Sequence, residues 1–297
     1  MANLLGPATD GPARLRALLA GDGPVVAPGA YDALSARLIE AAGFPAVYMT
    51  GFGVTASLIG RPDVGLLTMT EMTQTAGRIC SAVDVPVIAD ADTGYGNALN
   101  VIRTVREYEA AGVAGIHLED QVAPKRCGHL EGKQVIPVET MVDRIRAAVA
   151  ARRNPDFLLI ARTDARAVEG LESALLRARR YREAGADMLF VEAPVSSAEI
   201  STIATELAGV PLLFNWAEGG KTPATSLDRL RSLGFSLVIC PISALLAAAG
   251  AVREVLGRIS VDGTPEGVVS GLPGFSSFTS FLGLEEVESI GSLFGRG

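Results

Sequence analysis

The sequence predicts a single (β/α)8 barrel of the TIM type, an α/β fold in which helices surround eight parallel strands. Eight short apolar segments recur along the 297 residues, and longer stretches with helical spacing of apolar residues separate them. The short segments are almost continuously apolar, as strands buried on both faces of a parallel sheet must be. A chain of this length with 48% hydrophobic residues can bury the core that one barrel needs.

The expected strands are Val25–Ala30, Ala46–Gly51, Val85–Asp92, Gly115–Asp120, Phe157–Asp164, Met188–Pro194, Pro211–Ala217 and Leu237–Ser243. The clearest amphipathic helices are Asn97–Gly112, Val138–Ala151, Leu171–Gly185 and Ala198–Leu207. Glycines that end helices are expected at Gly43, Gly112, Gly185 and Gly234. An open doubly wound sheet is the alternative fold, but it would need a glycine-rich phosphate turn after the first strand, and residues 28–32 do not form one.

We expect the barrel to occupy residues 1–257 and a helical tail to occupy residues 258–297. The tail is rich in Gly, Pro, Ser and Phe, and its large apolar residues are Leu272, Phe275, Phe278, Phe281, Leu282, Leu284 and Phe294. Left on the surface of a monomer, these side chains would form a large exposed apolar patch. We therefore expect the tail to pack against another subunit.

Composition excludes several functional classes. The net charge is −7 and no basic run is present, so we expect no nucleic-acid partner. No apolar run reaches the roughly 18 residues of a membrane helix, and residues 1–11 lack the features of a secretion signal. The three cysteines, Cys80, Cys127 and Cys240, form neither a disulfide framework nor a zinc pattern. These observations favour a cytoplasmic protein without a membrane partner.

Polar residues stand where the predicted strands end, which is where barrel enzymes carry their chemistry. They include Tyr48, Thr50, Asp90, Asp92, His117, Glu119, Arg162, Glu192 and Asn215. Four of these residues are acids: Asp90, Asp92, Glu119 and Glu192. Their carboxylates, gathered in one barrel mouth, would repel one another unless a cation lay among them. Oxygen ligands without a His or Cys cluster favour Mg²⁺, or Mn²⁺ as a second choice. The alternative is pairing with Arg162 or helix N-termini, which would account for one or two of the four carboxylates.

A cysteine between cations follows the fourth predicted strand. Lys125 and Arg126 precede Cys127, and His129 follows it. Positive neighbours stabilise a thiolate relative to a thiol, so we expect the pKa of Cys127 to be low. The alternative is that Cys127 is only a small residue in a surface loop.

These motifs together resemble the isocitrate lyase/phosphoenolpyruvate mutase superfamily over about residues 25–249. The matching segments are Asp90-Ala-Asp92-Thr-Gly-Tyr-Gly, Glu119-Asp-Gln, Lys125-Arg-Cys127-Gly-His129, Arg162-Thr-Asp and Asn215-Trp-Ala-Glu218-Gly-Gly-Lys-Thr-Pro. The Lys-Arg-Cys-Gly-His loop is typical of the carbon–carbon lyase branch, which includes isocitrate, 2-methylisocitrate and 2,3-dimethylmalate lyases. The resemblance thus implies an Mg²⁺-dependent oxo-acid lyase that cleaves a 2-hydroxy di- or tricarboxylate to an α-oxo acid such as pyruvate.

The resemblance also implies a role for each site residue. Asp90 and Asp92 would hold magnesium, and Asp63 and Glu119 would reach it through water. Substrate would contact Thr50, Gly51, Phe52, Lys125, Arg126, Gly128, Arg162, Glu192 and Asn215. Cys127 would be the general acid on a mobile gating loop, and His129, with Lys125 and Arg126, would hold the charged intermediate. Arg162, with Thr50 and Gly51, would grip the α-oxo-acid half of the substrate. Tyr48 is a candidate for handling the proton of the C2 hydroxyl, although a core tyrosine is an equal alternative. Family members suggest a swapped C-terminal helix and a homotetramer built as a dimer of dimers.

One departure from the family pattern bears on the substrate. In 2-methylisocitrate lyases an Arg that reads an extra carboxylate stands at the position held here by Leu246, in Pro241-Ile-Ser-Ala-Leu-Leu246. A third carboxylate without a cation would be unfavourable. A dicarboxylate such as 2,3-dimethylmalate therefore fits better, unless another Arg from the tail or a neighbouring subunit substitutes. Oxaloacetate hydrolysis or decarboxylation, and a carboxyphosphonoenolpyruvate phosphonomutase-type reaction, remain the alternatives.

Overall fold

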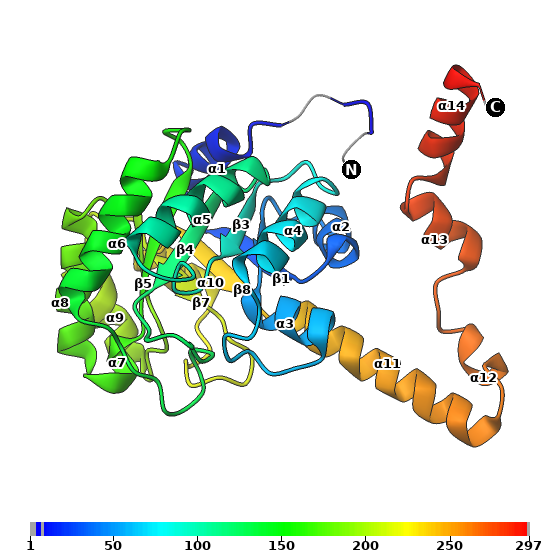
Figure 1. Ribbon diagram of the computed structural model, residues 1–297. Helices are drawn as coiled ribbons and strands as arrows, with labels where there is room; N and C mark the ends of the chain where they lie inside the picture. The colour runs from blue at the N-terminus through cyan, green and yellow to red at the C-terminus, as the bar shows by residue number, and fades with distance from the viewer. Residues whose placement is uncertain (1–3, 7–8, 296–297) are drawn as a thin grey trace. The chain divides into compact units, whose positions relative to one another are not determined.

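The computed structural model describes residues 4–6 and 9–295 and confirms the (β/α)8 barrel (Figure 1). The strands are β1 (Val25–Ala30), β2 (Val47–Met49), β3 (Val87–Asp90), β4 (Gly115–Glu119), β5 (Leu158–Thr163), β6 (Met188–Val191), β7 (Leu213–Asn215) and β8 (Leu237–Cys240). All paired strands are parallel, in the order β6-β5-β4-β3-β2-β1-β8-β7. A parallel bridge between Leu189 and Leu212 links the two ends of this sheet, so the barrel is nearly closed.

Helices cover the outside of the barrel (Figure 1). They are α2 (Ala33–Ala41), α3 (Gly51–Ile59), α4 (Met69–Cys80), α5 (Ala98–Ala110), α6 (Val138–Ala151), α7 (Ala165–Val168), α8 (Leu171–Glu183), α9 (Ser197–Glu206) and α10 (Leu227–Ser232). The first helix, α1 (Gly11–Leu19), packs instead against the apolar cluster inside the barrel. The four expected glycines follow α2, α5, α8 and α10 with positive φ, for example +86° at Gly112 and +107° at Gly185. Only glycine adopts this left-handed conformation without strain, which explains why these helices end there.

The strands bury side chains on both faces, which accounts for their apolar sequences. One apolar cluster fills the space between the strands and the helices. A second cluster lies inside the barrel and contains alternate strand residues, such as Ile88, Ile160 and Phe190. Leu15 of α1 belongs to this inner cluster and is fully buried. The period of two along each strand therefore separates the barrel interior from the helix-facing layer.

The chain divides into two compact units. Among the described residues the barrel unit ends at Leu245, and the second unit comprises residues 4–6 and 246–295. The expected boundary at residue 257 falls inside a helix, because α11 (Ser243–Asp262) runs through Gly257 without a break. The second unit continues with α12 (Glu266–Val269), α13 (Phe275–Phe281) and α14 (Leu284–Phe294).

The tail helices leave their apolar side chains exposed, as the sequence predicted. None of the described residues of α11 to α14 is buried within this chain, and Phe275 and Phe294 are 86% and 73% exposed. Within the same unit the Leu4 amide donates a hydrogen bond to Glu286 Oε1 at 2.7 Å. Within the part of the chain that the structure describes, no helix is both long and apolar enough to span a membrane.

Candidate active site

The polar side chains of the barrel mouth continue the inward-facing rows of the core. On β3, β5 and β6, the residues two positions beyond Ile88, Ile160 and Phe190 are Asp90, Arg162 and Glu192. Because side chains alternate along a strand, each of these polar groups points to the same side as the core residue before it. The fold therefore directs an aspartate, an arginine and a glutamate into the mouth at the carboxyl ends of the strands.

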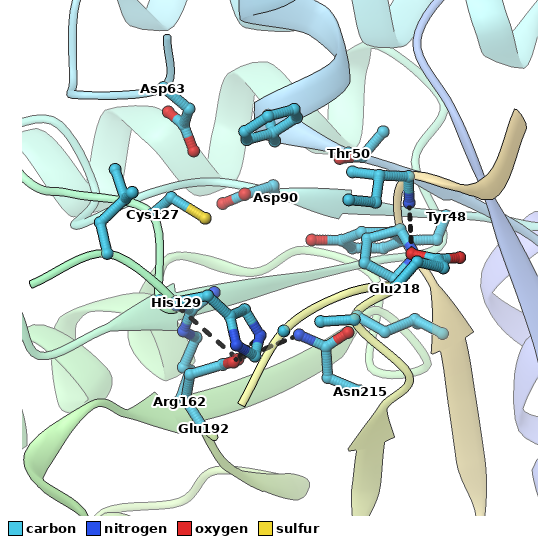
Figure 2. A pocket seen from close by; sticks show the side chains of 18 of the residues that line it. Tyr48, Thr50, Asp63, Asp90, Cys127, His129, Arg162, Glu192, Asn215 and Glu218 are labelled. Carbon is cyan, nitrogen blue, oxygen red and sulfur yellow. Dashed lines mark hydrogen bonds and ion pairs between the residues drawn. The ribbon is translucent and has the colours of Figure 1, made fainter. Parts of the chain in front are cut away.

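A cavity of about 190 Å³ lies in this mouth (Figure 2). The predicted site residues in its wall are Tyr48, Thr50, Phe52, Asp63, Asp90, Lys125, Cys127, Gly128, His129, Arg162, Glu192 and Asn215. Gly51, Asp92 and Glu119 do not line the cavity. They lie against it, because the space a side chain on Gly51 would fill is occupied by Asp90, Asp92 is 2.8 Å from Lys125, and Glu119 is 3.3 Å from Arg162.

Arg126 is the predicted substrate-binding residue that the structure places away from the cavity. Its side chain is exposed and its guanidinium donates to the Glu131 carbonyl oxygen at 3.3 Å. Its backbone amide donates to Gln121 Oε1 at 3.0 Å, while the buried side chain of Lys125 faces the mouth. The two neighbouring cations therefore have different partners, because Lys125 contacts Asp63 and Asp92 and Arg126 contacts the loop itself.

The cavity also has wall residues to which the sequence analysis gave no role. They are Leu130, Ala217, Glu218, Gly219, Gly220, Ile239, Pro241 and Ile242. Glu218 accepts hydrogen bonds from the Ile242 amide, at 3.2 Å, and from the Ser243 hydroxyl. Glu218 stands in the matching segment that begins at Asn215, three residues beyond the end of β7, where the mouth residues of a barrel are expected.

Lys125 lies between two carboxylates of the expected metal site. Its ammonium is 2.6 Å from Asp63 Oδ2 and 2.8 Å from Asp92 Oδ1. Burial lowers the pKa of Lys125, but the surrounding carboxylates outweigh burial and hold that pKa well above its ordinary value. Lys125 therefore stays charged and neutralises part of the acidic cluster.

Tyr48, His117 and Asp90 form a buried chain beside this cluster. The Tyr48 hydroxyl is 2.8 Å from His117 Nε2, which is 3.6 Å from Asp90 Oδ1. Burial lowers the pKa of His117 to about 4 despite the opposing effect of Asp90, and burial raises the pKa of Tyr48. Both groups are therefore neutral at pH 7, and His117 is a weak base that can hold a proton from Tyr48 only transiently.

The carboxylates suit a hard divalent cation, although side-chain cations already balance part of their charge. Asp63, Asp90, Asp92 and Glu119 are all buried. Glu119 Oε1 has no hydrogen-bond partner, and Lys125 is not aligned for a hydrogen bond to the nearby Asp92 Oδ1. Burial raises the pKa of Asp92 to about 6, with Asp90 and Asp63 adding to the shift. The buried carboxylates therefore lack positive charge and hydrogen-bond donors, and a bound Mg²⁺ would compensate for both.

The cluster does not provide a complete set of direct ligands. Within residues 4–6 and 9–295, no three His, Cys, Asp or Glu side chains are arranged to hold a metal by themselves. Mg²⁺ commonly binds through one or two carboxylates and keeps several waters. Direct binding by Asp90, with neighbouring carboxylates binding through water, is compatible with this mode of coordination.

Arg162 organises the opposite side of the cavity. Its guanidinium donates to both oxygens of Asp164, at 2.9 and 3.2 Å, and lies 3.3 Å from Glu119 and 3.7 Å from Glu192. It also lies over the ring of Phe190, 5.1 Å from the ring centre. The sequence alternative of acids pairing with Arg162 is thus realised for Glu119 and Glu192.

Glu192 joins Arg162 to two further site residues (Figure 2). His129 Nε2 lies 2.9 Å from Glu192 Oε1, and the Asn215 amide nitrogen donates to both carboxylate oxygens at 3.3 and 3.2 Å. Burial alone would raise the pKa of Glu192, but Arg162 and His129 lower it to about 2. Glu192 is therefore ionised at every physiological pH and fixes the two donors.

The expectation of a low pKa for Cys127 is wrong. Burial raises the pKa of its thiol, with Asp63 and Glu192 adding to the increase, and these effects outweigh the His129 amide and Arg162. The neighbouring cations do not compensate, because Lys125 pairs with Asp63 and Asp92 and Arg126 points outward. Cys127 nevertheless points into the cavity (Figure 2), which excludes the interpretation of a plain surface residue. At neutral pH it is a protonated thiol and can donate a proton.

Comparisons with known sequences show the family to which the chain belongs. The profile of the family described as phosphoenolpyruvate phosphomutase matches residues 15–260. A 2,3-dimethylmalate lyase of Eubacterium barkeri is 48% identical over 96% of this chain and 98% of its own length. A 2-methylisocitrate lyase of Aeropyrum pernix is 46% identical over 92% of this chain and 88% of its own length.

Solved structures are similar over nearly the whole chain. A crystal structure of 2,3-dimethylmalate lyase, described as a PEP mutase/isocitrate lyase superfamily member, has a TM-score of 0.92 and 42% identity, covering 98% of this chain and 97% of that one. Phosphonopyruvate hydrolase in complex with oxalate and Mg²⁺ has a TM-score of 0.87 and 34% identity, covering 96% and 98%. Because the profile spans most of the barrel and the relatives match nearly end to end, the chain belongs to the phosphoenolpyruvate phosphomutase family, within the PEP mutase/isocitrate lyase superfamily.

Proposed function

We propose that this protein is an Mg²⁺-dependent carbon–carbon lyase that cleaves an alkylmalate, with 2,3-dimethylmalate as the preferred candidate, to pyruvate and a monocarboxylate. The observation that carries the proposal is the protonated thiol of Cys127 facing a cavity that also holds Arg162 and Asp90. Carbon–carbon cleavage leaves a strongly basic carbon, which a nearby acid must protonate in a site that is closed to water. The similarity to 2,3-dimethylmalate and 2-methylisocitrate lyases supports the same reaction class.

The cavity favours a dicarboxylate that carries alkyl groups. Phe52, Leu130, Ile239 and Ile242 form an apolar part of its wall. The two buried cations that line it are already paired, since Arg162 contacts Asp164, Glu119 and Glu192, and Lys125 contacts Asp63 and Asp92. A third substrate carboxylate would therefore be buried without its own cation, which is unfavourable.

The first turn of α3 supplies an anion site for the oxo-acid half of the substrate. Thr50 is the N-cap of α3, and its hydroxyl accepts a hydrogen bond from the Gly53 amide at 3.2 Å. A helix N-terminus carries partial positive charge and free amides, which favour a carboxylate. Gly51 leaves room beside Asp90, because a Cβ at this position would lie 2.5 Å from Asp90 Oδ2.

Asp90 and Asp92 would hold the magnesium, with Asp63 and Glu119 nearby. The chemistry that a bound Mg²⁺ supplies is Lewis-acid stabilisation of the charge that develops on the oxo-acid fragment. Tyr48 Oη would accept the proton of the C2 hydroxyl while its own proton passes to His117 Nε2, 2.8 Å away, and this proton would return to the Cys127 thiolate once the products have left. The C2–C3 bond then breaks, and its electron pair remains on C3.

Cys127 completes the reaction by protonating C3 from its thiol. Arg162 and His129 face the same cavity and would stabilise the negative charge of the leaving fragment. The loop that carries Cys127 covers the cavity and keeps water from the basic carbon. Glu192 and Asn215 hold the positions of these groups rather than exchange protons themselves.

A substrate panel tests the proposal. Purified protein with Mg²⁺ is assayed for pyruvate release from 2,3-dimethylmalate, 2-methylisocitrate and isocitrate, and for loss of oxaloacetate. We expect the highest kcat/KM for 2,3-dimethylmalate. Consumption of oxaloacetate alone would contradict the proposal and favour a hydrolase or decarboxylase.

We also propose that the protein acts in a reducing cytoplasm as a homotetramer. All three cysteines are free, and the exposed apolar residues of α13 and α14 need a partner surface.

A further inference from the structure

A buried lysine outside the predicted site connects the Cys127 loop to the barrel. The side chain of Lys133 is 2% exposed. Its ammonium donates a hydrogen bond to the Gly128 carbonyl oxygen and lies 3.5 Å from Asp164 Oδ1. A lysine is rarely buried unless its charge is paired, so these contacts define its position.

The partner carboxylate belongs to the support of the substrate-facing arginine. Asp164 accepts both hydrogen bonds from Arg162 and is itself held by its backbone amide, which donates to Asp120 Oδ1 at 2.9 Å. Lys133 therefore ties the loop to the same carboxylate that orients Arg162. If Lys133 is removed, Asp164 keeps Arg162 as its ion-pair partner, so no buried charge is left alone.

The other contact of Lys133 is with the residue next to the proposed acid. Gly128 packs so closely against the barrel that a Cβ at this position would lie 2.5 Å from Arg162 Nη2 and 2.7 Å from Glu192 Cγ. Its carbonyl oxygen is thus fixed over the mouth by Lys133 from one side and by the barrel wall from the other. Cys127 precedes this peptide directly, and its amide donates to the Asp63 carbonyl oxygen at 3.1 Å.

Lys133 reaches the tip of the loop from its base. The loop is closed at its base by a bridge between Gln121 and Val135 and by the Val122 amide, which donates to the Gln134 carbonyl oxygen at 2.9 Å. Lys133 stands beside this base, while Gly128 and Cys127 lie near the tip. The lysine side chain therefore crosses the inside of the loop and links its base to its tip.

We propose that Lys133 is a positioning residue that holds Cys127 over the cavity by bridging the Gly128 carbonyl and Asp164. This inference rests on the proposed lyase function only for its catalytic consequence. Its conformational consequence, a closed loop with a shielded thiol, does not depend on the reaction.

The same loop offers a matched control. Glu131 forms an ion pair with Lys221 across the loop surface, and its side chain is 87% exposed. Both pairs link the loop to the barrel, but only the Lys133 contacts are buried. An exposed pair contributes little, so Glu131→Gln should leave the loop closed.

The test is the rate at which iodoacetamide modifies Cys127 in the full-length protein without substrate, followed by peptide mass spectrometry. We expect Lys133→Met to increase this rate by roughly tenfold or more, because it removes a buried hydrogen bond to a charged group. Glu131→Gln should stay within about twofold of the wild type. Half-buried Cys80, on α4, is the internal reference and should not change in either variant.

Activity provides the second readout. Lys133→Met should lower kcat for pyruvate release by roughly tenfold or more, while KM changes little, because the acid is displaced and the substrate contacts remain. Unchanged modification of Cys127, or an equal increase at Cys80, would overturn the proposal. If Lys133→Met does not fold, Lys133→Gln decides by the same criteria, with a smaller increase expected because an N–H donor is kept. A protein without lyase activity would refute the proposed function and leave the modification test intact.

Discussion

Cys127 keeps its proton because of its surroundings rather than its sequence neighbours. Burial raises the pKa of the thiol, and the cations beside it in the sequence pair with other groups or face solvent. A general acid must carry a proton at the working pH, so the raised pKa suits the proposed role better than a low one would. Burial also raises the pKa of Tyr48, so that the tyrosine keeps its own proton until it takes part in proton transfer with the C2 hydroxyl.

Replacing this acid should slow the chemical step. We expect Cys127→Ser to lower kcat by about 10²- to 10⁴-fold, because a hydroxyl is a much weaker acid than a thiol. KM should change little, because the substrate contacts of Thr50 and Arg162 remain. Steady-state kinetics check this, with Cys80→Ser as the control, since Cys80 does not line the cavity. A Cys127→Ser enzyme within about threefold of the wild type would contradict the role.

If Asp92 holds the metal as proposed, we expect metal binding to depend on pH. The pKa of Asp92 is raised to about 6 by burial, so the carboxyl is increasingly protonated as the pH falls below 6. Mg²⁺ binds the carboxylate and must displace that proton, so the apparent affinity should fall by up to about tenfold per pH unit below this value. Titration calorimetry at pH 5.0 and pH 7.5 measures it. Equal affinities at both values, or an unchanged pH dependence in Asp92→Asn, would rule out this assignment.

At the scale of elements, the strands were predictable and the loops were not. The row that places Asp90, Arg162 and Glu192 in the mouth follows from the alternation of side chains, which any strand imposes. The loop after β4 has no such period. Lys125 turns inward while Arg126 turns outward. This difference depends on the contacts of Lys125 with Asp63 and Asp92, which lie far away in the sequence.

The family motifs named most of the residues that line the cavity, but they gave no role to Lys133 or Glu218. Both residues belong to loops, where Lys133 donates to the Gly128 carbonyl oxygen and Glu218 accepts from the Ile242 amide. The conformation of such a loop cannot be predicted from the spacing of residue types in the sequence. The end of the barrel unit was also misplaced, because nothing in the composition around Gly257 marks the middle of α11.

Gly128 has no room for a side chain where the Cys127 loop packs against the barrel. An added methyl group would lie 2.5 Å from Arg162 Nη2 and 2.7 Å from Glu192 Cγ. Arg162 is held by two hydrogen bonds to Asp164 and cannot move aside cheaply. We expect Gly128→Ala to lower kcat by about 10²-fold, the usual effect of an ångström-scale displacement.

The matched control is Gly250→Ala, where an added methyl group meets nothing within 4 Å. Both variants should melt within a few degrees of the wild type, which is measured by calorimetry alongside the kinetics. Full activity in Gly128→Ala would show that the loop does not seat against Arg162 during turnover.

At the scale of the whole molecule, the barrel and the tail have different requirements. The barrel buries its own core, whereas none of the described residues of α11 to α14 is buried within this chain. Apolar patches of this kind mark surfaces that another subunit covers. The tail is therefore expected to stabilise an oligomer rather than the barrel itself.

Removing the tail should change the assembly. We expect the full-length chain to sediment as a tetramer, and a chain ending at Gly257 to dissociate or aggregate. Sedimentation velocity at several concentrations separates these outcomes. A well-behaved, fully active monomer from either chain would show that the tail is not an assembly element.

The central claim, carbon–carbon cleavage followed by protonation on carbon, is tested most directly by following 2,3-dimethylmalate in D₂O by NMR. The account predicts equal amounts of pyruvate and propionate, one deuterium at C2 of each propionate, and no products after exhaustive chelation or in Asp90→Ala. Products that persist after chelation, or substrate loss without propionate, would contradict it.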